Sequence, residues 1–239
     1  GRILREGPFE DIWIQPAAGD AGGALGAALF AAHQVHDFPR PEGEPGRDLQ
    51  RGSYLGPSFT TDHIVSWLDR KQYPYTRYEP AEVPGVVADI LTQGKVVGFF
   101  SGPMEFGPRA LGARSIIGDP RDQDMQRTLN LTIKYRESFR PCAPSCLVEH
   151  VQEYFELDRP SPYMLLVAPV QEKRRKAMSE DQQSLFGIAK LNVPRSDIPA
   201  ITHVDYSARV QTVDKRDHPQ YWALIHEFKK RTGYGVIVN

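Results

Sequence analysis

The sequence predicts an α/β fold, because short apolar runs typical of strands alternate with longer segments that have helical periodicity. The size of the chain supports this class: with 239 residues, 40% of them hydrophobic, it can bury a complete core. Strands are expected at residues 95–100, 114–117, 143–148, 163–170, 204–213 and 234–238, and helices at residues 21–32, 60–68, 83–93, 122–133, 149–155 and 218–232.

Local signals set the boundaries of several elements. Asp20 stands just before the first helix, where its carboxylate can accept the unpaired amide hydrogens of the first turn. Gly94 follows the helix at 83–93 as a C-cap, and the strand at 95–100 is apolar enough to be buried. Residues 171–196 are polar, with a basic run inside them, so we expect a solvated excursion there.

A composition change divides the chain. Residues 37–52 contain three prolines, three glycines and alternating charge, which is typical of a linker with no fixed place in a core. We therefore predict a C-terminal remnant of an upstream domain at 1–36, a linker at 37–58 and a second domain at 59–239. The chain does not begin with Met and stops directly after an apolar run, so we expect a piece of a longer protein whose second domain is truncated at its C-terminal end.

The overall composition argues against several classes of protein. A net charge of −1 lacks the positive field of a general nucleic-acid binder, so no nucleic-acid partner is expected. The longest small and apolar run, 21–32, is too short to cross a bilayer and no leader opens the chain; we expect a cytoplasmic protein with no membrane partner. Cys142 and Cys146 lack the spacing of a disulfide framework or a zinc site and are expected to be packing thiols.

Positive charge is concentrated in residues 95–140. Eight basic and five acidic residues give this segment +3, which leaves −4 for the rest of the chain. Arg109 lies between two expected strands in a loop shaped by Gly and Pro, where backbone amides and a guanidinium can bind phosphate together. Lys134, Arg136 and Arg140 follow a helix, and in an extended chain their even spacing would direct them to one face.

The residues alone leave two interpretations open for this basic segment. It can form a pocket for a ligand with several phosphates, or a solvated rim in which Glu137 and nearby aspartates balance the charges. His33 and His36 are expected to have surface or packing roles, and His203 with Asp205 is expected to form a structural pair.

Longer motifs resemble those of the NodU/CmcH/TobZ family of O-carbamoyltransferases. The resemblance covers nearly the whole chain, and its motifs are long and occur in order. They are Pro16-Ala17-Ala18-Gly19-Asp20, Met104-Glu105-Phe106-Gly107-Pro108-Arg109-Ala110-Leu111-Gly112-Ala113-Arg114-Ser115, Lys134-Tyr135-Arg136-Glu137-Ser138-Phe139-Arg140-Pro141, Ser161-Pro162-Tyr163-Met164 and His203-Val204-Asp205-Tyr206-Ser207-Ala208-Arg209-Val210-Gln211-Thr212-Val213.

The resemblance implies a YrdC-like twisted mixed sheet with flanking helices, preceded by a short remnant of a Kae1-like (actin/Hsp70-like ATPase) domain. In such enzymes the YrdC-like part combines carbamoyl phosphate and ATP into carbamoyladenylate, and the Kae1-like part passes the carbamoyl group to a hydroxyl of a small-molecule acceptor. A homodimer is left open. Fe²⁺ is implied in the Kae1-like domain of the full-length protein, and Asp20 matches one of its ligands, whereas the ligand histidines lie upstream of this chain.

The resemblance also implies the site residues. Arg109, Lys134 and Arg140 match catalytic residues that bind the phosphates, and Arg209, Arg114 and Ser115 complete the expected binding set for carbamoyl phosphate and nucleotide. The family's next motif would begin at Asn239 and supplies a serine of the nucleotide site, so this chain is expected to be incomplete for full activity.

Three positions depart from the family pattern. Cys142 replaces a usual Phe and Ala113 an Asn, both expected to be packing changes, whereas Tyr206 replaces a Gly and is expected to narrow the nucleotide side. Two alternative functions remain. A threonylcarbamoyladenylate-forming tRNA-modification enzyme would keep the YrdC-like fold, and a non-catalytic nucleotide- or RNA-binding module would need a broad basic face.

Overall fold

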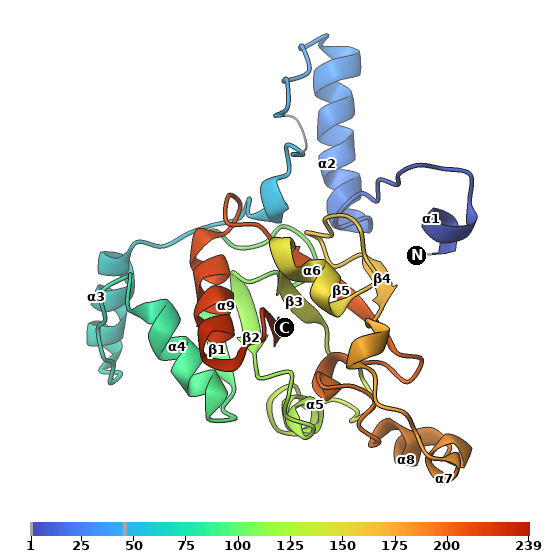
Figure 1. The fold of residues 1–239 in the computed structure, drawn as a ribbon. Helices are drawn as coiled ribbons and strands as arrows, with labels where there is room; N and C mark the ends of the chain where they lie inside the picture. Colours follow the sequence, from blue (N-terminus) through green and yellow to red (C-terminus); the bar gives the residue numbers. More distant parts are fainter. Residues whose placement is uncertain (1, 45–46) are drawn as a thin grey trace.

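The chain folds around one mixed sheet (Figure 1). The computed structural model describes residues 2–44 and 47–239. Four strands lie in the order β4-β5-β3-β6, with β3 parallel to β5 and the other pairs antiparallel. An antiparallel pair, β1 and β2, joins this sheet where Gly118 bridges to Val238. The strands are β1 Val97–Phe100, β2 Arg114–Ile117, β3 Pro144–Leu147, β4 Leu166–Pro169, β5 Ser207–Val213 and β6 Val236–Val238.

Helices flank the sheet, which confirms the α/β class. The predicted helices and strands are present with shifted ends, and three short helices, α1, α7 and α8, were not predicted. The last two lie within the polar excursion. The helices are α1 Arg2–Glu6, α2 Asp20–Phe30, α3 Thr61–Lys71, α4 Val83–Thr92, α5 Met125–Thr128, α6 Val151–Tyr154, α7 Glu180–Ser184, α8 Gly187–Leu191 and α9 Pro219–Thr232; α2 and α5 continue into the π-helical turns Ala31–Val35 and Leu129–Ile133.

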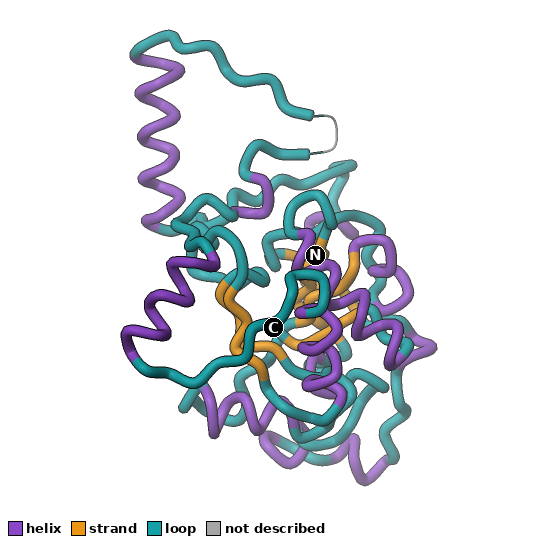
Figure 2. The backbone as a smooth tube through the Cα atoms, turned by 90° about the vertical axis from the view of Figure 1, so that its left-hand side faces the viewer, coloured by secondary structure: helices purple, strands orange, loops and turns teal. Residues whose placement is uncertain are grey.

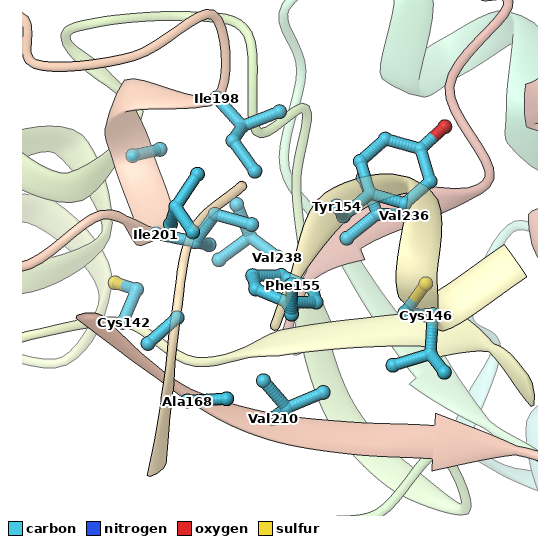
Figure 3. Close-up of a cluster of buried hydrophobic side chains, with 14 of the residues drawn as sticks. Cys142, Cys146, Tyr154, Phe155, Ala168, Ile198, Ile201, Val210, Val236 and Val238 are labelled. Atoms are coloured by element: carbon cyan, nitrogen blue, oxygen red, sulfur yellow. The ribbon is translucent and has the colours of Figure 1, made fainter. Parts of the chain in front are cut away.

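Each face of the sheet has its own apolar core. Because side chains alternate along a strand, Leu147 and Ile237 face α4 and α9, whose Leu91 and Phe228 are fully buried against them. The opposite face carries the cluster drawn in Figure 3, in which Tyr154, Phe155, Ile198 and Ile201 pack on Val210, Val236 and Val238. Cys142 and Cys146 are buried and free in this second cluster, as predicted.

Helix α2 projects away from the rest of the chain and buries none of its side chains (Figure 2). The predicted cap at Asp20 is wrong: Gly19 is the N-cap residue, Asp20 is already helical, and no side chain caps this end. The backbone supplies the missing acceptor instead, since the amide of Gly22 donates to the carbonyl of Ala17 at 2.7 Å.

The second half of the predicted linker is docked on the sheet domain. Arg47 forms an ion pair with Asp217 at 2.6 Å, and the Tyr54 hydroxyl donates to the carbonyl of Leu111 at 2.7 Å. Backbone hydrogen bonds join residues 53–57 to Met104 and Phe106. The Pro- and Gly-rich composition predicted a linker that cannot bury enough apolar surface to have a fixed place in a core. The structure fixes its second half by polar contacts instead. Gly46 and the adjacent Pro45 lie outside the described residues.

Strand β5 begins later than predicted because residues 203–206 form a tight turn. Tyr206 has a left-handed backbone with φ of 64°, a conformation that favours glycine. Its hydroxyl donates to the carbonyl of Lys176, and Arg175 lies over its ring. The side chain therefore lies against the excursion at 171–196. Separately, among the described residues no helix is long and apolar enough to cross a membrane.

Replacing Gly112 with Ala should strongly destabilise the fold. The glycine has φ of 114°, and an added Cβ would overlap the ring of Tyr221, which is fully buried. We expect a loss of about 3 kcal/mol or more in the free energy of unfolding, measured by chemical denaturation. Gly98→Ala is the control, because a Cβ there meets no atom within 4 Å. Equal effects of the two substitutions would contradict this account of the loop.

Candidate anion-binding site

The loop between β1 and β2 is organised around a buried carboxylate. One oxygen of Glu105, Oε1, accepts hydrogen bonds from the amides of Leu111 at 2.7 Å, Ala113 at 2.7 Å and Arg114 at 3.1 Å. The amide of Gly112 donates to Ser115 Oγ at 2.9 Å. These four amides are therefore satisfied by the protein itself. The expected approach of loop amides to a phosphate is therefore closed for Leu111 and Gly112, whereas for the part of the loop around Arg109 it stays a prediction.

The carbonyl groups of the same loop are also fixed. Leu111 O accepts from Gln211 Nε2 at 2.6 Å as well as from Tyr54, and Ala110 O accepts from Asn239 Nδ2 at 3.1 Å. At Gly107, which has φ of 114°, an added Cβ would lie 2.6 Å from the Cβ of Ala17. The loop that carries Arg109 is therefore held by contacts from strand β5, from the residue after β6 and from the N-terminal segment.

Four partly buried basic residues gather beside this loop, and we call Arg109, Lys134, Arg136 and Arg209 the cation cluster. Burial lowers the pKa of Arg209, and the neighbouring charges of Arg109 and Arg136 lower it further. The pKa of Lys134 is lowered by burial, against a smaller opposing effect of Cys142, and by Arg136. Positive charges this close together repel one another. A bound anion relieves that repulsion, so the arrangement favours anion binding.

The cluster has no directly paired carboxylate among the described residues, although the charge of Arg136 contributes to lowering the pKa of Glu137. Across residues 2–44 and 47–239, none of its four members forms an ion pair with a carboxylate. Arg136 Nε donates to the amide oxygen of Asn130 at 2.7 Å, and Arg209 Nη1 only to the carbonyl of Met164 at 3.4 Å. Of the two interpretations left open for the basic segment, a solvated rim balanced by carboxylates fits Arg140 and Glu137, which form an ion pair, better than it fits Arg109, Lys134 and Arg209.

Other predicted site residues lie differently. Arg140 is exposed and pairs with Glu137 at 3.1 Å, because residues 134–140 bend and turn instead of running extended. Tyr135, with φ of 45°, lies in this bend. Arg136, which was part of the basic segment but not of the expected binding set, joins the cluster instead. Its even spacing from Lys134 was the available signal.

Arg114 and Ser115 support the loop from β2. The guanidinium of Arg114 lies 3.5 Å from the centre of the Phe100 ring and donates to the carbonyls of Gly102 and Ala113 at 3.0 and 2.9 Å. Ser115 is buried and is the acceptor for Gly112 described above. In this structure both side chains make contacts that stabilise the conformation of the loop.

The structure does not bring metal ligands around Asp20. This residue is exposed at the start of α2, and among the described residues no group of three His, Cys, Asp or Glu side chains could hold a metal ion. His33 Nδ1 instead contacts the carbonyl of Phe38 at 2.8 Å. The donor set of the described residues therefore does not fit iron.

His218 links α9 to the loop and is uncharged at neutral pH. Its Nδ1 accepts from the amide of Tyr221 at 3.2 Å, so its Nε2 carries the proton that it donates to the carbonyl of Gly112 at 3.1 Å. Burial lowers the pKa of His218 to about 4, against smaller opposing effects of its hydrogen bonds and Glu105. The His218 ring therefore has a structural role at pH 7 and does not transfer protons.

A separate cleft of about 460 Å³ lies between the N-terminal segment and the start of β4. Trp13 and Tyr163 meet edge to face in its wall. None of the cation cluster lines it. Among the described residues, three of its four arginines are in ion pairs with aspartates and only Arg51 is not, so the cluster, in which no member is paired, is the stronger indication of a site.

Comparison with known proteins gives two family matches. The family profile described as "Carbamoyltransferase C-terminus" matches residues 88–239, and that described as "Carbamoyltransferase N-terminus" matches residues 1–29. The first profile includes the whole cation cluster.

Individual relatives align over almost all of the chain. "Uncharacterized protein sll1178" of Synechocystis is 57% identical over 100% of the chain and 39% of its own length. Nodulation protein NolO of Bradyrhizobium diazoefficiens is 39% identical over 100% and 40%. The 3'-hydroxymethylcephem-O-carbamoyltransferase of Amycolatopsis lactamdurans is 34% identical over 98% and 38%. The chain therefore spans about two fifths of the length of these relatives.

The His218 ring should make folding stability depend on pH. Its pKa is about 4 in the folded chain and near 6.5 when exposed, so the unfolded chain binds the extra proton between these values and stability falls as the pH drops from 6.5 to 4. His218→Asn keeps a cap for Tyr221 but does not titrate. We expect the stability lost between pH 7.5 and pH 4.5 to shrink by roughly 2 to 3 kcal/mol in this variant.

Urea denaturation at the two pH values measures this difference. His36→Asn, which alters an exposed ring beyond α2, should leave the pH profile unchanged. An unaltered profile in His218→Asn would show that this ring is protonated at the same pH in the folded and unfolded chains.

Proposed function

The chain belongs to the carbamoyltransferase family that includes NolO, NodU and the 3'-hydroxymethylcephem-O-carbamoyltransferase, and on this premise we propose that it supplies the carbamoyl-activating part of an ATP-dependent O-carbamoyltransferase. In this proposal the residues from 59 onward form a YrdC-like domain, residues 37–58 connect it, and residues 1–36 end a Kae1-like domain. Its substrates are carbamoyl phosphate and ATP, and the final acceptor is a hydroxyl of a small molecule.

The cation cluster is the observation on which this proposal rests. Carbamoyl phosphate and ATP together bring several phosphate groups, and guanidinium and ammonium groups bind these best when no internal carboxylate competes. Arg109, Lys134, Arg136 and Arg209 meet this condition, as described above. No cysteine or serine nucleophile is needed, because phosphoryl and adenylyl transfer depend mainly on positioning and fixed positive charge.

The proposed reaction consumes one water molecule. Carbamoyl phosphate, ATP and one water give carbamoyladenylate, phosphate and pyrophosphate. The cation cluster binds the phosphates of both substrates and stabilises the negative charge that develops on the departing phosphate and pyrophosphate oxygens. Glu105 does not take part directly, since its carboxylate is buried under the loop amides.

Replacing Arg109 or Arg209 with Met should abolish carbamoyl activation. Each change removes a guanidinium charge from the cluster while keeping an unbranched apolar stem in its place, and we expect the rate to fall by about 100-fold or more. The assay is carbamoyl-phosphate-dependent exchange of labelled pyrophosphate into ATP by the full-length protein. Arg216→Met is the matched control, because Arg216 is exposed and pairs with Asp214; its rate should stay within about twofold of the unaltered protein.

The same assay separates the alternatives. Absence of carbamoyl-phosphate-dependent exchange in the unaltered full-length protein would overturn the proposed function. Exchange that requires threonine and bicarbonate instead would support a threonylcarbamoyladenylate-forming enzyme, and ATP binding without any exchange would support a binding module.

A further inference from the structure

Gln211 joins the loop of Arg109 to the strand of Arg209 through a buried polar network. Its side chain is 1% exposed, and its Nε2 donates to Leu111 O at 2.6 Å. Its Oε1 accepts from Ser145 Oγ at 2.6 Å and from Asn239 Nδ2 at 3.0 Å. Both ends of the amide are therefore used, which fixes its orientation as well as its position.

This network lies between two parts of the cation cluster. Residues two apart on a strand share one face of a sheet, so Gln211 and Arg209 lie on the same face of β5. Leu111 follows Arg109 by two residues in the loop. The hydrogen bond from Gln211 to Leu111 therefore connects the strand that carries Arg209 to the loop that carries Arg109.

The two guanidinium groups repel each other. The charge of Arg109 is one of the causes that lower the pKa of Arg209, and no carboxylate of the described residues pairs with either side chain. Without a bound anion, this repulsion favours movement of the loop away from β5. A buried hydrogen bond from the strand to the loop opposes that movement, because breaking it leaves polar groups without partners in the interior.

We propose that Gln211 is a positioning residue for phosphate binding, which holds the Arg109 loop against β5 so that Arg109 and Arg209 can bind one anion together. It acts through Leu111 and touches no substrate. Ser145 assists by holding the amide oxygen of Gln211. This inference rests on the proposed function, since the anion in question is the phosphate part of carbamoyl phosphate or ATP.

The test compares pyrophosphate binding by variants of the full-length protein. Gln211→Met has nearly the same volume and length but cannot hydrogen bond, and we expect its Kd for pyrophosphate to rise about tenfold by isothermal titration calorimetry. Ser145→Ala is a milder change that leaves the bond to Leu111 in place, and its Kd should rise about threefold.

Thr212→Val is the matched control for structural damage. Thr212 is the next residue of β5, is 3% exposed, and accepts one buried hydrogen bond from the amide of Ser161 at 2.7 Å on the opposite face of the sheet. Both Gln211→Met and Thr212→Val should lose comparable stability in urea, but the Kd of Thr212→Val should stay within about twofold of the unaltered protein.

The outcomes distinguish this inference from the proposed function. Equal weakening of pyrophosphate binding in Gln211→Met and Thr212→Val, or no weakening in either, overturns the positioning role, as does a failure of the unaltered protein to bind pyrophosphate. If the contrast between the two variants is present but carbamoyl-phosphate-dependent exchange is absent, Gln211 positions an anion site and the proposed reaction is overturned alone.

Discussion

The carboxylate of Glu105 is the constraint on which the site depends. It is buried at the centre of the loop between β1 and β2, and its Oε1 accepts three backbone amides. A carboxylate that receives several amide hydrogens is a strong acceptor, and it replaces the water that these amides would otherwise need. These hydrogen bonds hold the backbone from Leu111 to Arg114 in the structure, and Arg109 is presented next to this anchored segment.

Around this fixed loop the fold brings together charges that oppose one another. Arg109 is on the loop, Lys134 and Arg136 follow the turn Leu129–Ile133, and Arg209 is on β5. Folding must offset their repulsion and their partial burial, and it does so with interactions that have no charge of their own. These include the ring of His218 on Gly112, the amide of Gln211 on Leu111 and the contact of Ala17 with Gly107. Among the described residues, the positive charge of the cluster is thus left without a directly paired carboxylate, which is the condition that the proposed anion site requires.

Much of the fold follows from sequence periodicity. The alternation of strand-like and helical segments predicted the α/β class, and Gly94, which has a left-handed backbone, marked the end of α4. What periodicity could not show is how polar segments pack. The composition of residues 47–57 is that of a linker, but Arg47 and Tyr54 fix it by an ion pair and a hydrogen bond to residues far along the chain.

The structure agrees with the predicted placement of three site residues and departs from it where backbone geometry decides. The motif match identified Arg109, Lys134 and Arg209, which the structure brings into one cluster; their roles in binding substrate stay a prediction. Even spacing suggested that Arg140 would join them, but this argument assumed an extended backbone, and a turn moves Arg140 to an exposed pair with Glu137. Likewise, nothing in the local sequence shows that Glu105 accepts hydrogen bonds from the amides of Leu111, Ala113 and Arg114.

The bridge between Gly118 and Val238 also has a consequence for synthesis of the protein. It joins the β1–β2 pair to the rest of the sheet through residues that are separated by 120 positions along the chain. At ribosomal rates of about 5–20 residues per second, the first partner waits on the order of ten seconds for the second to be made. During that interval the β1–β2 hairpin has an unpaired edge, and the loop of Arg109 cannot reach its final supports on β5 and β6. A nascent chain at this stage is exposed to wrong strand pairing, so chaperone binding should be greatest before residues 236–238 emerge.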